Sequence, residues 1–62
     1  MNVKVGDTIR IDFMAGEPNY IGRTGIVKLI DAIGQLHGTW GGCAVIPSED
    51  EFTIIKNEEP KK

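Results

Sequence analysis

Gly22-Arg23-Thr24-Gly25-Ile26-Val27 is the strongest indication of architecture in this chain of 62 residues. Two glycines at the entrance to a strand let the backbone bend sharply before Val27 points inward. The preceding run from Asp7 to Phe13 alternates apolar and polar residues, which is typical of a half-buried strand. A sharp bend between such strands predicts a small, strongly curved β-barrel.

Further strands are predicted over residues 25–30, 35–40, 43–46 and 52–55. In the second strand Val27 and either Leu29 or Ile30 are expected to point inward, and Phe13 and Phe52 also fit the core pattern. The segment 14–21 holds Gly, Pro and Asn without a sustained period, so it is predicted to be a loop.

Gly41-Gly42 is predicted to join the third and fourth strands as a hairpin, because adjacent glycines accept positive φ at both turn positions. With a two-residue turn, Trp40 opposes Cys43. Gly38 then opposes Val45, and both pairs lie on one face of the sheet, which is expected to be the core.

Residues 47–52 predict a single helical turn, because Ser48 can cap it and Glu51 can reach back to the capping residue's amide. The expected fold is therefore all-β: a five-stranded, partly open bent barrel with one short helical turn before the last strand. A small open meander that dimerises along an edge is the alternative. Residues 1–55 form the predicted domain, and residues 56–62 are expected to be a disordered polar tail.

Composition restricts the class of protein and its partners. The start of the chain lacks the apolar stretch of a secretory signal, and the single cysteine, Cys43, allows no intrachain disulfide. A cytoplasmic protein without a membrane span is expected. The net charge of −2 lacks the basic excess that nucleic-acid binders use to neutralise phosphates.

Residues suited to catalysis or metal binding are few. His37 and Cys43 invite a Cys–His nucleophile hypothesis, but the predicted register places them on opposite faces of the sheet. One His and one Cys fall short of a structural zinc site, and consecutive acids at 49–51 lack the spacing of a calcium loop. A strand rather than a helix follows Gly22 and Gly25, which disfavours a phosphate loop. Neither an enzyme nor a cofactor is predicted, although an active site shared across subunits stays open.

Aromatic side chains carry the binding hypothesis. Trp40 beside the paired glycines, and Tyr20 near Pro18 in the long loop, could flank a groove for an extended peptide. Alternatively, Trp40 plugs the barrel and Tyr20 packs the loop down. The favoured function is an interaction module that contacts a protein through the 14–21 loop and the Trp40 hairpin. The alternative is a nucleic-acid-binding barrel with an aromatic platform and three basic residues: Arg10, Arg23 and Lys28.

Several short motifs in order suggest a family: Val5-Gly6-Asp7, Gly22-x-x-Gly25-x-Val27, Ile30-Asp31, Trp40 and Ile46-Pro47-x-x-Asp50-x-Phe52. Over residues 3–55 the chain resembles an uncharacterised domain family of Firmicute bacteria and their phages and mobile elements. That family has an acidic residue and a longer turn after the tryptophan, which Gly41-Gly42 shortens here. The chain is also similar to KOW-type and Src-homology-3-like barrels, which implies that fold, and implies binding only by analogy.

Overall fold

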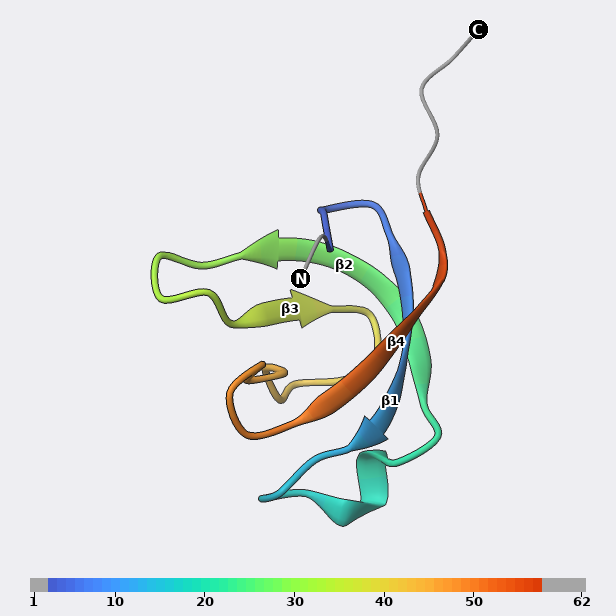
Figure 1. The fold of residues 1–62 in the computed structure, drawn as a ribbon, viewed down its shortest axis with the longest axis vertical. Helices are drawn as coiled ribbons and strands as arrows, with labels where there is room; N and C mark the ends of the chain where they lie inside the picture. Colours follow the sequence, from blue (N-terminus) through green and yellow to red (C-terminus); the bar gives the residue numbers. More distant parts are fainter. Residues whose placement is uncertain (1–2, 58–62) are drawn as a thin grey trace, which may run out of the picture.

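The computed structural model describes residues 3–57. These residues contain four strands: β1 (Thr8–Phe13), β2 (Thr24–Ile30), β3 (Leu36–Gly38) and β4 (Glu51–Lys56), with one 3-10 turn, η1 (Pro18–Tyr20), between β1 and β2 (Figure 1). The strands are antiparallel and form one sheet in the order β3-β2-β1-β4. The all-β prediction is confirmed. Within residues 3–57 no helix is long and apolar enough to cross a membrane.

β2 is the longest strand, and it joins the two halves of the sheet. Its first residues pair with β1, whereas Val27, Leu29 and Ile30 pair with β3. Figure 1 shows β2 as a long curved arc. The sheet is open, because β3 and β4 are its edges and are not neighbours. Of the predicted tail, Lys56 belongs to β4, and residues 58–62 lie outside the described part.

The two glycines at the start of β2, Gly22 before the strand and Gly25 within it, have different roles. Gly22 adopts a φ of +92°, a conformation that glycine tolerates and other residues rarely adopt. Gly25 needs no positive φ, but a Cβ there would lie 2.8 Å from the amide nitrogen of Trp40. The bend therefore uses Gly22, while Gly25 makes room for a neighbouring segment.

The predicted strand over residues 43–46 is reduced to a single bridge between Leu36 and Val45. Their backbone groups exchange hydrogen bonds of 2.9 and 2.8 Å, whereas Gly38, the predicted partner of Val45, pairs with Val27. The prediction of a two-residue hairpin is wrong, because Thr39 stays bonded to β2: its amide donates to the Ile26 carbonyl at 3.1 Å. The chain then needs a wider connection to return.

The turn before β4 is present, but a different side chain stabilises it. The Ile46 carbonyl accepts the amides of Glu49 and Asp50 at 2.8 and 2.7 Å. The buried carboxylate of Asp50 accepts the amides of Ile46 and Ala15, both at 2.9 Å. Asp50 thus reaches back to the amide at the start of the turn, the role predicted for Glu51, and it also ties the turn to the loop after β1.

Within the described part of the chain, eight buried apolar side chains form the core: Ile9, Ile11, Met14, Val27, Leu36, Trp40, Val45 and Phe52. The prediction for Phe52 is confirmed, but that for Phe13 is wrong, since Phe13 is 45% exposed. A register shift between Ile11 and Phe13 breaks the alternation of β1, so Met14 fills the inward position instead. A second shift, between Val27 and Leu29, turns Leu29 outward and packs Ile30 against the core.

Candidate interaction surface

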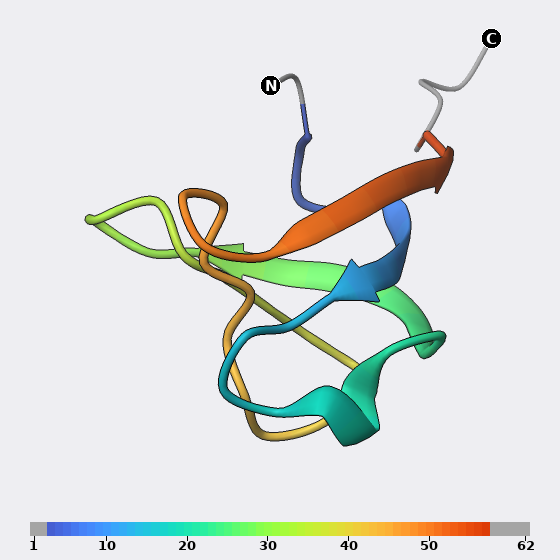
Figure 2. The same cartoon turned by 60° about the horizontal axis from the view of Figure 1, so that its bottom comes forward.

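The loop between β1 and β2 and the connection after β3 lie side by side (Figure 2). The Arg23 guanidinium donates through Nη1 to the Trp40 carbonyl at 2.9 Å. A Cβ on Gly41 would lie 2.6 Å from Tyr20 Oη, and its φ of +144° favours a glycine at this position. We call the surface formed by residues 14–23 and 40–43 the loop platform. It joins the two segments that the sequence selects for partner binding.

Tyr20 and Arg23 form the rigid centre of the loop platform. The Arg23 guanidinium carbon lies 4.1 Å from the centroid of the Tyr20 ring, a cation–π contact. The Arg23 amide also donates to the Tyr20 carbonyl at 3.0 Å. Tyr20 itself is half-buried and packs against the core. It therefore fastens the 14–21 loop to the core of the sheet, as one of the two alternatives for this residue predicts.

Trp40 also takes the core position of its two alternatives. Its side chain is only 3% exposed, and its indole Nε1 donates to the Cys43 carbonyl at 2.8 Å. The indole ring is thus unavailable for stacking, and the backbone of Trp40, through its carbonyl, is what contributes to the loop platform. The exposed apolar groups of the platform include Pro18, at the start of η1, and Ile21, which is 48% exposed.

The three predicted basic residues do not form one patch. Arg10 pairs with Thr24 across the sheet, whereas Arg23 precedes β2 and its guanidinium reaches the Trp40 carbonyl. Arg10 is also ion-paired, since its Nε lies 2.8 Å from Asp12 Oδ1. Lys28 is exposed on β2 at the irregularity between Val27 and Leu29. This separation weakens the nucleic-acid alternative, which needs several cations along one path.

A polar cluster beside Arg10 involves Asp12 and Thr53. The Thr53 hydroxyl donates to Asp12 Oδ2, and Arg10 donates to the other carboxylate oxygen. These bonds, that from Thr53 above all, hold the pKa of the Asp12 carboxyl below its usual value. The cluster joins β1 to β4 on the outer face, so it has a structural role.

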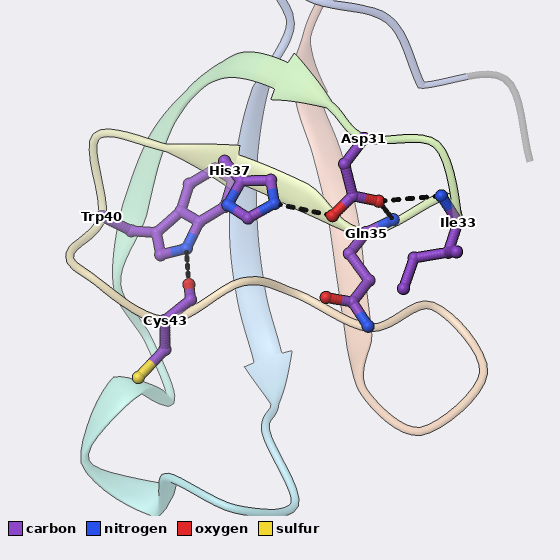
Figure 3. A network of polar contacts seen from close by, with 6 residues as sticks. All are labelled: Asp31, Ile33, Gln35, His37, Trp40 and Cys43. Atoms are coloured by element: carbon purple, nitrogen blue, oxygen red, sulfur yellow. Dashed lines mark hydrogen bonds and ion pairs between the residues drawn. The ribbon is translucent and has the colours of Figure 1, made fainter.

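His37 and Cys43 do not act together. The His37 ring lies 2.9 Å through Nε2 from Asp31 Oδ2, and Figure 3 shows the Cys43 sulfur pointing away from that ring. Asp31 Oδ1 accepts the amides of Ile33 and Gln35 at 3.1 and 2.9 Å. Asp31 therefore organises the turn between β2 and β3, and His37 extends that network.

The stability contributed by Asp31 is expected to depend on pH. The hydrogen bond from His37, followed by those from the Gln35 and Ile33 amides, lowers the pKa of the Asp31 carboxyl below 3.8. A lowered folded-state pKa means that the stabilisation is present above 3.8 and is lost as the pH falls through the folded-state value. Urea unfolding of the wild type and of Asp31→Asn should therefore give free energies whose difference shrinks as the medium is acidified. A difference that stays constant with pH would contradict this role.

No three His, Cys, Asp or Glu side chains among residues 3–57 gather in a way that could hold a metal ion. Comparison with the models of protein families, with curated proteins and with solved structures finds no match. The resemblance to the Firmicute and phage family therefore stays a prediction.

Proposed function

We propose that this protein is a non-enzymatic interaction module that binds a protein partner through the loop platform. The observation that carries the proposal is the direct contact between the platform's two loops, made by Arg23 on the Trp40 carbonyl and by Tyr20 on Gly41. These contacts hold an exposed surface that includes Pro18 and Ile21 on a rigid base. A surface ordered before binding loses less conformational entropy when a partner docks.

The fold proposed for this module is a reduced Src-homology-3-like, KOW-like barrel. The module is proposed to act in the cytoplasm. The support for the fold is the curved β2 shared by two strand pairs and the bridge at Val45, which occupies the place of a fifth strand. The likeness concerns architecture, since such barrels host many unrelated functions.

The test compares three baits for capture of partners from the source cell: wild type, Ile21→Glu in the loop platform, and Ile33→Glu as a matched control. Both isoleucines are exposed, and Ile33, at 77%, lies in the turn at the other end of β2. A charge placed in an apolar contact is expected to weaken binding about tenfold or more in Ile21→Glu alone. All three baits should melt at nearly the same temperature.

Equal capture by all three baits would refute the platform as the binding surface. Binding of single-stranded DNA or RNA that weakens steeply with salt would instead favour the nucleic-acid alternative. The salt dependence of binding by the wild type and the effect of Ile21→Glu on capture therefore distinguish a protein partner from a nucleic acid.

A further inference from the structure

The two arginines of the chain are in different electrostatic situations. The Arg10 guanidinium is neutralised by Asp12, 2.8 Å away, and also reaches the Thr53 hydroxyl at 3.3 Å. Arg23 has no carboxylate partner among residues 3–57: its guanidinium contacts the Tyr20 ring and the Trp40 carbonyl. Arg23 is exposed, so this unneutralised charge faces solvent on the loop platform.

The Arg23 side chain is also held in position from two sides. The guanidinium carbon lies 4.1 Å from the centroid of the Tyr20 ring, and Nη1 donates to the Trp40 carbonyl, so two contacts restrain the guanidinium. Nε and Nη2 have no hydrogen-bond partner within the described chain. Together they form one edge of the guanidinium, and that edge matches the two oxygens of a carboxylate.

We infer that Arg23 is the site at which the loop platform binds a carboxylate group of its protein partner. This inference rests on the proposed function and names the chemistry that the partner must present: an acidic side chain or a free C-terminus. Because stacking and the carbonyl bond already restrain the arginine, less side-chain entropy is lost when the carboxylate arrives.

A single carboxylate fits this surface better than a polyanion does. The other arginine, Arg10, is ion-paired with Asp12, and the whole chain carries a net charge of −2. A nucleic acid gains affinity by neutralising several phosphates in sequence, whereas a peptide carboxylate needs one bidentate partner. The exposed side chain of Ile21, in the same turn as Arg23, would favour a carboxylate next to an apolar residue.

The inference can be tested with two matched probes on the wild-type protein: N-acetyl-leucine, which has a free carboxylate, and N-acetyl-leucinamide, which does not. The readout is the NMR signal of the arginine Nε–H groups, with Arg10 as an internal control because its Nε already donates to Asp12. We expect a saturable shift at Arg23 with the acid, and about tenfold weaker binding of the amide. Arg23→Lys keeps the charge but lacks the two-donor edge, so it should lose this preference for the acid.

Equal responses to the acid and the amide, or equal responses of Arg10 and Arg23, would overturn the inference. Stronger binding of a single-stranded oligonucleotide than of the acid at Arg23 would overturn it in favour of nucleic acid. These outcomes are independent of the bait experiment: a platform that fails to bind carboxylate can still lose its partner in Ile21→Glu.

Discussion

Replacement of Trp40 by alanine is expected to lower the free energy of unfolding by about 3–5 kcal/mol. The indole is 3% exposed and packs in the core that spans both halves of the sheet, so its removal leaves a cavity that a small domain cannot easily fill. A chain of this size is stabilised by only about 3–9 kcal/mol in total, so Trp40→Ala is expected to lose at least about a third of its stability. Urea unfolding followed by far-ultraviolet circular dichroism measures the change.

Trp40→Phe is the matched variant, because it keeps an aromatic ring in the core but removes the N–H that donates to the Cys43 carbonyl at 2.8 Å. Loss of that bond, together with the smaller ring, is expected to cost about 1–3 kcal/mol. A loss below about 1 kcal/mol in Trp40→Ala would contradict the core position of the indole.

Gly38→Ala is expected to destabilise the protein by about 3 kcal/mol through overpacking. A Cβ at this position would lie 2.3 Å from the Ile26 carbonyl oxygen and 2.3 Å from Trp40 Cζ3. Neither group can move freely, since one belongs to the backbone of β2 and the other fills the core. Thermal and urea unfolding should both show the loss.

Gly42→Ala is the control, because a Cβ there has no heavy atom within 4 Å. Its stability should stay within about 0.5 kcal/mol of the wild type. Gly25→Val should behave like Gly38→Ala, since its Cβ would lie 2.8 Å from Thr39 Oγ1. If Gly38→Ala and Gly42→Ala melted at the same temperature, the close packing of the indole against β3 would be refuted.

These core contacts also position the proposed binding surface. The Trp40 ring lies in the core, and its backbone carbonyl accepts a hydrogen bond from Arg23. The contact between the two loops of the platform therefore depends on the position of Trp40. Variants that displace the indole are therefore expected to disturb the Arg23 edge as well as stability. Surface variants such as Ile21→Glu separate the two effects, because they leave the core unchanged.

The sequence was sufficient to select the two segments of the candidate site, but not to predict which of their side chains are buried. The 14–21 loop and the segment after β3 stood out through Tyr20, Trp40 and the paired glycines. Whether the two aromatic rings face solvent or the core depends on contacts between segments about 20 residues apart in the chain. The role of Asp50 was missed for the same reason: its carboxylate binds the amide of Ala15, 35 residues away.

The local pattern of the chain was sufficient for the all-β class, the curvature before β2 and most of the apolar core, because alternation and glycine conformation act over a few neighbouring residues. The number of strands, their register and the exposure of Phe13 were decided by tertiary packing. Three register shifts in the strand pairing and the bond from the Thr39 amide to the Ile26 carbonyl set these features. Such choices depend on the energy of contacts between distant segments, which no short stretch of sequence contains.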